Sequence, residues 1–272
     1  MLKYSFDNGG SFFKELRRRV ELHFSNTKLH PAGNAKLYLK SILQVLSAAA
    51  LYIVLVFYTP SAVIAIPLCA LLGLNLAVIG FNVMHEGGHQ CFSRYTWLNN
   101  ISAYFLNILG GNAYYWKIKH NINHHTYTNV EGMDSDIDIK PFMRLHEAQP
   151  RRGYHRFQHI YCVFLYSISY LAWIFYEDFQ KYFSGKVSAN NEKKRLPSRE
   201  HVIFWFTKIM FISAYIVVPI FIVGLLSWLI GFLVVTFVCG LSISIVFQLA
   251  HVVEGTQFHS ASEGGTLDKK EE

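Results

Sequence analysis

The chain has 272 residues, of which 52% are hydrophobic and 16% are charged, and its formal net charge is +7. Its apolar residues occur in long blocks instead of the short periodic runs of a soluble core, which indicates an integral membrane protein of one domain. The basic residues flank these blocks, a distribution that favours control of membrane topology and contact with anionic lipid over nucleic-acid binding.

The four cysteines, Cys69, Cys91, Cys162 and Cys239, have no paired spacing, so we expect neither a disulfide framework nor a thiolate metal site. The N-terminal residues lack the short apolar core and cleavage site of a signal peptide, and we expect no export. Residues Ser11 to Phe24 place apolar side chains at helical spacing opposite a basic face. This pattern fits a helix that lies on the membrane or one that packs on a partner.

Four apolar blocks predict two membrane-spanning hairpins, because each approaches the roughly 20 residues that cross a hydrocarbon core. The predicted spans are about 41–58, 62–84, 202–221 and 225–248. The first hairpin turns at 59–61. The second hairpin comes from nearly continuous apolar sequence over 202–248, which Pro219 and Gly224 interrupt. Lys208 is the only charged residue inside the second hairpin, and we expect its side chain to reach toward the interface.

Two further apolar segments, Trp97 to Trp116 and Ile160 to Tyr176, are diluted by asparagine and tyrosine. Histidines that serve one site must be separated by even numbers of crossings, so we expect both segments to lie along the interface or against protein. The hairpin turns carry no lysine or arginine, whereas the other ends of the spans are basic. The positive-inside rule therefore predicts that the histidine clusters face the cytoplasm, in a multi-pass protein of the bacterial inner membrane.

Two histidine clusters follow apolar spans. The first is His85-Glu86-Gly87-Gly88-His89, and the second is His120-Asn121-Ile122-Asn123-His124-His125. Histidines four residues apart on a helix share one face and can bind a single metal or two adjacent ones. A packed group of neutral imidazoles leaves ring nitrogens without partners unless a cation accepts them. The spacing predicts a metal site, but ligation by nitrogen alone suits zinc, copper or iron.

The first cluster also matches H-E-x-x-H, the pattern of zinc proteases in which the glutamate acts as general base. An intramembrane zinc protease is therefore an alternative function. Adjacent Gly87 and Gly88 disfavour the uninterrupted helix of that motif, and the second cluster would have no role in it.

The two clusters, followed by Thr126-Tyr127-Thr128-Asn129, the acidic run at 134–138 and the segment 247–254 around His251, resemble the membrane fatty-acid desaturases, in particular the bacterial acyl-lipid or acyl-CoA branch. The resemblance extends from about Phe12 to Phe258. It implies an all-α membrane domain over 1–258, with a cytoplasmic cap in which histidines hold two non-haem irons, and a polar tail at 259–272. It also implies an O2-dependent oxidoreductase that introduces a cis double bond into an acyl chain in lipid metabolism.

Carried over by position, the resemblance implies six metal ligands: His85, His89, His120, His124, His125 and His251. Gln248 could orient His251 through a hydrogen bond. The acidic residues Asp134, Asp136 and Asp138 could steady ligand N–H groups or form a solvated loop. Three arginines, Arg151, Arg152 and Arg156, could hold a headgroup or a coenzyme A phosphate, or act as topological anchors.

The family pattern includes a third histidine box with paired histidines, and none follows Phe258 here. His259 is interpreted as a solvated tail residue. We therefore hypothesise weak or single-metal occupancy, and an inactive truncated remnant remains an alternative, as does a sister di-iron hydroxylase or ketolase. Product analysis would separate a double bond from an added oxygen.

The expected partners are an acyl-CoA or acyl-lipid substrate, O2, membrane lipid and a separate electron donor, ferredoxin or a cytochrome b5-like protein. The segment His30-Pro31-Ala32-Gly33 is similar to a haem-binding motif of cytochrome b5. Too few residues surround it to form a separate haem domain.

Overall fold

The computed structural model describes residues 11–131, 134–187 and 196–260, and most of these residues are helical. The first half contains α1 (Ser11–Thr27), α2 (Ala35–Ile53) with η1 (Val54–Tyr58), α3 (Ala62–Ile79) with η2 (Gly80–Met84) and α4 (His85–Gly88), α5 (Thr96–Ile108), and α6 (Ala113–Lys117) with η3 (Ile118–His124). The second half contains η4 (Ser135–Ile137), η5 (Gly153–Phe157), α7 (Gln158–Ala172), η6 (Trp173–Glu177), α8 (Asp178–Ser184), α9 (Ser198–Ile212), η7 (Ser213–Val217), α10 (Val218–Val223) and α11 (Leu225–His251). The predicted all-α membrane fold is confirmed.

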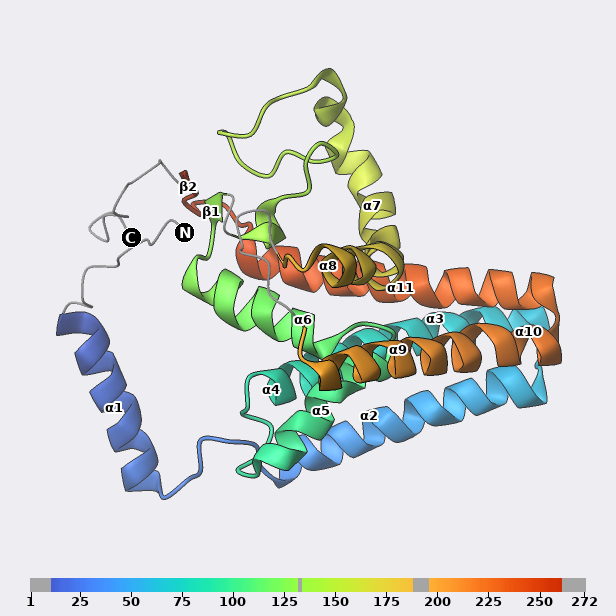
Figure 1. Ribbon diagram of the computed structural model, residues 1–272, viewed down its shortest axis with the longest axis horizontal. Helices are drawn as coiled ribbons and strands as arrows, with labels where there is room; N and C mark the ends of the chain where they lie inside the picture. The colour runs from blue at the N-terminus through green and yellow to red at the C-terminus, as the bar shows by residue number, and fades with distance from the viewer. Residues whose placement is uncertain (1–10, 132–133, 188–195, 261–272) are drawn as a thin grey trace.

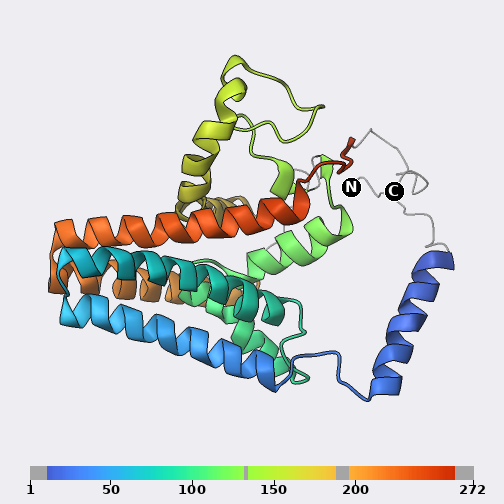
Figure 2. The ribbon, with the colours of Figure 1, turned by 180° about the vertical axis from the view of Figure 1, so that it is seen from behind.

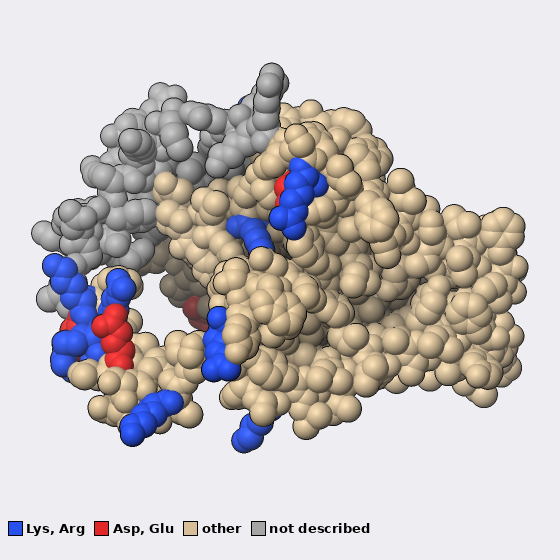
Figure 3. All heavy atoms as spheres, turned by 60° about the horizontal axis from the view of Figure 1, so that its bottom comes forward, with Lys and Arg blue, Asp and Glu red and all other residues tan. Residues whose placement is uncertain are grey.

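Four long helices lie side by side and form a bundle (Figures 1 and 2). They are α2–η1, α3–η2–α4, α9–η7–α10 and α11, and they correspond to the four predicted spans. The helix at α2 begins at Ala35, six residues before the prediction, because the Asn34 side chain caps it by accepting hydrogen bonds from two backbone N–H groups. In Figure 3, the lysine, arginine, aspartate and glutamate side chains that are visible lie near α1 and over the middle of the molecule, and none is visible at the opposite end, on the right.

Pro219 does not break its helix as the sequence suggested. The π-helical turn η7 precedes it, and the chain continues through α10 to Gly224, whose positive φ of 83° ends the helix. Proline cannot donate to the carbonyl four residues earlier, that of Tyr215. The indole N–H of Trp228 on α11 donates to this carbonyl at 2.9 Å, so the freed oxygen ties the two helices of the hairpin together.

A fifth helix, Gly153–Ser184, is also long and apolar enough to cross a membrane, whereas the sequence analysis assigned four spans. Its α7 segment runs in a different direction from the bundle helices and projects from the side of α11 in both views (Figures 1 and 2). It packs closely on α11, where a Cβ added to Gly240 would lie 2.5 Å from the Ser167 carbonyl oxygen. The segment from Trp97 to Trp116 does not form a spanning helix, because a turn at Gly110 divides it into α5 and α6.

Lys208 does not extend toward the interface, and this prediction is wrong. Its side chain is buried, and its ammonium group donates to the carbonyls of Gly110 and Ile174 and to the Asp178 carboxylate, at 2.6, 2.8 and 3.0 Å. These contacts use all three ammonium protons. The ion pair with Asp178 stabilises the ammonium charge and joins α9 to α8. The hydrogen bond to Gly110 joins α9 to the turn before α6.

The apolar core lies between these helices, with Leu72, Leu76, Phe211 and Cys239 among its buried residues. The four cysteines are free, as predicted. The only strand pairing among the described residues joins β1 (Val130–Glu131) in parallel to β2 (His259–Ser260). The backbone of His259, assigned to a solvated tail, is thus paired with that of Val130, while 261–272 lie outside the described residues.

Candidate metal centre

The six predicted ligands come together at one end of the bundle. His85 begins α4, and His89 follows it. His120 and His124 lie in η3, and His125 directly follows. His251, the last residue of α11, has its ring centroid 4.5 Å from that of His124. Helices separated by more than 100 residues thus deliver histidines to the same end of the bundle.

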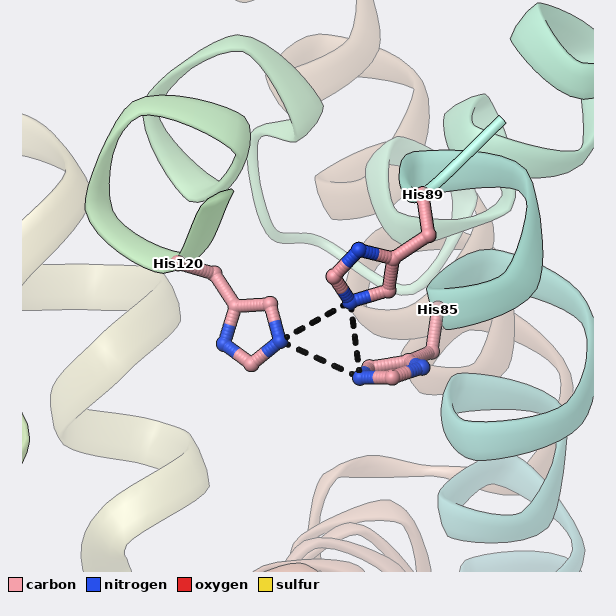
Figure 4. A group of neighbouring side chains, drawn as sticks. All are labelled: His85, His89 and His120. Carbon is pink, nitrogen blue, oxygen red and sulfur yellow. Dashed lines mark hydrogen bonds between the residues drawn. The ribbon is translucent and has the colours of Figure 1, made fainter. Parts of the chain in front are cut away.

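Three of these side chains form a triangle, which we call the histidine triangle: His85, His89 and His120 (Figure 4). Their Nε2 atoms lie 3.1, 3.2 and 3.3 Å apart. Ligand nitrogens about 2.1 Å from one metal lie roughly 3.0 to 3.4 Å from each other. Imidazole protons alone cannot satisfy three nitrogens that face one another, because a protonated nitrogen cannot accept a hydrogen bond. The donor set therefore fits a metal ion.

Both glycines of the first cluster are required by close packing. A Cβ on Gly87 would lie 2.5 Å from the backbone nitrogen of Ala103, and one on Gly88 would lie 2.2 Å from the indole ring of Trp116. These contacts let α5 and α6 approach the turn that carries His85 and His89. The two glycines thus bring the first histidine segment against the second.

Trp116 covers the triangle, although the sequence analysis did not single it out. Its ring stacks on His120 with 4.5 Å between centroids and contacts the rings of His85 and His89 by their edges. Its position one helical turn before His120 is the only sequence signal for this role. His125 lies on another side, with its ring 4.9 Å from His89 and 4.7 Å from His120.

His124 is held by a buried acidic pair. Its Nδ1 lies 2.9 Å from a carboxylate oxygen of Asp134, whose side chain has no exposed surface, and 3.7 Å from Asp136. Asp134 therefore holds the ring of His124, a candidate ligand, which is the contact expected of one of the two roles considered for the acidic run. Asp136 forms a 2.6 Å ion pair with Lys119. With Nδ1 bonded to the carboxylate, Nε2 of His124 remains available to a metal.

Asp134, Asp136 and His124 could themselves hold a metal ion by geometry. Lys119 already supplies a cation to this group. Burial disfavours the charge of Lys119, but Asp136 and Glu177 outweigh that effect and raise its pKa. We therefore interpret the acidic pair as support for His124 and not as a separate metal site.

His251 is oriented by its own helix. Its Nδ1 lies 2.6 Å from the carbonyl oxygen of Phe247, so Nδ1 carries the proton and Nε2 is free. The predicted hydrogen bond from Gln248 is therefore replaced by the carbonyl of the residue before it. The reason is local, because an imidazole four residues later in a helix lies close to that carbonyl.

The environment keeps most of the cluster neutral. Burial and the neighbouring imidazoles lower the pKa of His89 to about 4 and that of His120 to about 2, and burial also lowers the pKa of His125. His124 is the exception, since hydrogen bonding and charge from the acidic pair outweigh burial and raise its pKa. Neutral imidazoles are the form that binds metals.

The glutamate of H-E-x-x-H takes no place in the triangle. A carboxylate oxygen of Glu86 lies 3.0 Å from Sγ of Cys91, a contact consistent with a neutral thiol. Burial and this carboxylate raise the pKa of Cys91 to about 12, which makes it no thiolate ligand. A protease would need this glutamate beside the metal-bound water, so the arrangement disfavours that alternative.

The remaining candidates lie apart from these contacts. Asp138 is exposed beside Lys140. Arg151, Arg152 and Arg156 are exposed on the segment that leads into α7. His146, which sequence reasoning missed, is buried against Phe258, and neither of its ring nitrogens has a hydrogen-bond partner.

Known proteins are similar in sequence to this chain over most of its length. The chain is 29% identical to an acyl-lipid (8-3)-desaturase of Physcomitrium patens over 98% of its residues and 56% of that protein's. It is 30% identical to an sn-1 linoleoyl-lipid 6-desaturase of Arthrospira platensis, over 94% of this chain and 70% of that protein. The identity to the protein of the same name in Synechocystis sp. is 26%, over 98% of this chain and 74% of that protein.

The chain thus spans between about half and three quarters of the length of these relatives. A profile of the family described as fatty acid desaturase matches residues 60–265, which include all six histidines of the cluster. The match agrees with the resemblance drawn from the histidine clusters. The chain belongs to the fatty acid desaturase family.

Proposed function

We propose that the chain is an iron-dependent fatty acid desaturase whose metal ligands are the six clustered histidines. The histidine triangle carries the proposal, because three Nε2 atoms 3.1 to 3.3 Å apart fit one metal ion. His124 and His251, with rings 4.5 Å apart and Nδ1 of each already bonded, support a second metal position. Membership of the family favours iron over zinc for both.

The proposed reaction removes two hydrogens from adjacent methylenes of an acyl chain. An acyl –CH2–CH2– segment, O2, two electrons and two protons give –CH=CH– and two waters. Bound iron would supply the oxygen chemistry, which zinc cannot because it has no redox states. The chain's own residues hold the ligands: Asp134 and Phe247 orient His124 and His251, and Trp116 shields one side of the histidine triangle.

For the substrate, we propose an acyl chain carried by a membrane lipid. The names of the relatives refer to acyl-lipid and linoleoyl-lipid substrates. The apolar bundle supports a location in the membrane beside such lipids. We further propose four crossings with the histidine end facing the cytoplasm, since both hairpin turns lack basic residues. Electrons would come from a separate reduced carrier.

Metal content and product together test this proposal. The full chain would be purified from membranes in detergent, its iron measured by mass spectrometry, and its products from a lipid substrate with O2 and a reduced carrier analysed as methyl esters. His120→Ala should reduce iron affinity at least about tenfold. His23→Ala, which changes an exposed histidine of α1, is the matched control and should retain iron.

Three results would contradict the proposal. Iron that stays bound in His120→Ala would place the metal elsewhere. A product that gains oxygen and has no new double bond would assign a hydroxylase. Tightly bound zinc with no redox-active iron after growth in iron-rich medium would exclude desaturation by this centre.

A further inference from the structure

The N-terminal helix α1 (Ser11–Thr27) contributes no residue to the metal centre. It stands away from the bundle, to which a short connecting segment joins it (Figures 1 and 2). The ion pairs that the structure gives its arginines are all internal, joining Arg17 to Glu21 and both Arg18 and Arg19 to Glu15. Its orientation is therefore set by something other than ionic contacts with the bundle.

One side of α1 is apolar, and over most of its length no other described part of the chain covers it. We define the apolar face of α1 as Phe12, Phe13, Leu16, Val20 and Phe24, which fall within about 120° of a helical wheel at 100° per residue. Phe12 is 77% exposed and Phe13 60% exposed. Phe24, near the other end, is half-buried in a cleft of about 490 Å³ that the connecting segment and Glu86 also line. Two exposed phenylalanines side by side are costly in water.

We propose that α1 lies on the bilayer surface, with its apolar face in the lipid and its basic residues at the anionic headgroups. The apolar face distinguishes this from a solvated helix. Four basic residues (Lys14, Arg17, Arg18 and Arg19) exceed the two acidic ones, so the helix carries a formal charge of +2 that suits anionic lipid.

The connection to α2 keeps this surface within reach. Only residues 28–34 separate α1 from α2, the first bundle helix, and an extended segment of this length spans at most about 25 Å. The backbone N–H of Gly33 donates to the Cys91 carbonyl at 2.9 Å, and a Cβ on Gly33 would lie 2.1 Å from the Phe92 carbonyl oxygen. The connecting segment is therefore fixed to the turn after His89. A helix tethered this close to a bilayer meets lipid at a high effective concentration.

Two leucines of α1 provide a matched pair for the test. Leu16 is 46% exposed and Leu22 44% exposed, so the two sites are equally accessible in the protein alone. They point about 120° apart around the helix, and Leu22 lies outside the apolar face. A difference between the two labels must therefore come from what contacts the apolar face of α1.

The experiment places a bimane fluorophore on Leu16→Cys or Leu22→Cys in the full chain, with Cys91 and Cys162 changed to serine and the parent without a new cysteine as the blank. The labelled protein is reconstituted in vesicles with about one fifth anionic lipid. Quenching is measured with lipids that carry a nitroxide near the top of the acyl chain and, separately, with iodide in water.

The proposal predicts that lipid nitroxide quenches the label at Leu16 at least about twofold more than the label at Leu22, while iodide shows the reverse order. Replacing the anionic lipid with a zwitterionic one should reduce the difference. Equal access of iodide to both labels would overturn the proposal and leave a solvated helix. A Leu16 label protected from both quenchers would also overturn it, because a protein partner would then cover the apolar face.

Discussion

Asp134 offers the sharpest test of how the chain prepares a metal ligand. Its two carboxylate oxygens accept three hydrogen bonds: Oδ2 from His124 Nδ1–H and the Asn129 N–H, and Oδ1 from the Asp136 N–H. The side chain has no exposed surface, so water cannot replace a lost bond. Asp134→Asn keeps the shape of the side chain but replaces one of the two oxygens with an NH2 group. That group then faces either the donors of Oδ2 or the donor of Oδ1, and it cannot accept a hydrogen bond from them. Asp134→Ala removes all three bonds.

The magnitudes follow from this count. Asp134→Asn can still accept from His124 if its NH2 group faces the Asp136 N–H, which leaves one buried donor unpaired at about 1 to 3 kcal/mol. Its charge is lost, and we expect metal affinity to fall about tenfold, or about 1.4 kcal/mol. Asp134→Ala frees His124 to change its ring orientation and protonated nitrogen, and we expect a loss of about 100-fold.

The assay is a titration of the metal-free protein in detergent with Co²⁺, followed by its visible absorption. Asp138→Ala is the control, because this neighbouring carboxylate is exposed beside Lys140 and has no contact with a histidine of the cluster among the described residues. If Asp134→Ala and Asp138→Ala bind Co²⁺ with the same affinity as the unchanged chain, Asp134 does not orient a ligand and the reasoning is wrong. Circular dichroism of each variant separates this result from misfolding.

Three further predictions concern the packing and protonation around the site. Gly88→Ala should release the metal at least about tenfold more readily, because the added Cβ would displace the tryptophan that covers the histidine triangle, and the same Co²⁺ titration measures it. Lys208→Met should destabilise the fold by about 3 to 5 kcal/mol by leaving Asp178 unpaired, and adding Asp178→Leu should restore much of this loss in thermal unfolding. The low pKa of His89 and of His120 means that the unfolded chain binds more protons, so metal-free protein should lose stability as pH falls from about 6.5 toward 4 in detergent-based unfolding, whereas a rise in stability would refute the neutral cluster.

In the sequence analysis, the histidines were assumed to share one site, and the parity of crossings was used to decide which apolar segments span the membrane. The structure supports that assumption, because residues 85–125 and His251 lie at one end of the bundle. Sequence periodicity could not supply the partners of these residues. Lys208 pairs with Asp178, which lies thirty positions away on another helix. An analysis of each apolar block by itself cannot find this partner, so it predicts that the charge extends to the interface. Trp116 likewise becomes part of the site only when Gly88 allows the two histidine segments to touch.

Helix ends and local hydrogen bonds were missed for a different reason. The start of α2 depends on the Asn34 cap, which lies outside the apolar block that hydropathy detects. For His251, the sequence offered Gln248 as a partner because this amide side chain lies one helical turn earlier. A backbone carbonyl in the same helix was nearer, and main-chain acceptors leave no mark in the sequence.

The charges behind His124 explain why this imidazole differs from the others. Asp134 and Asp136 bring two negative charges to a buried place, and Lys119 supplies only one positive charge. The missing cation must come from His124 or from what it binds, which is why its pKa is raised while those of His89 and His120 are lowered. A metal on Nε2 of His124 supplies that positive charge without a proton, and the hydrogen bond to Asp134 then strengthens with the charge on the ring. The acidic pair thus favours a cation at the point where η3 meets the end of α11, while the neutral histidine triangle beside it supplies nitrogen lone pairs.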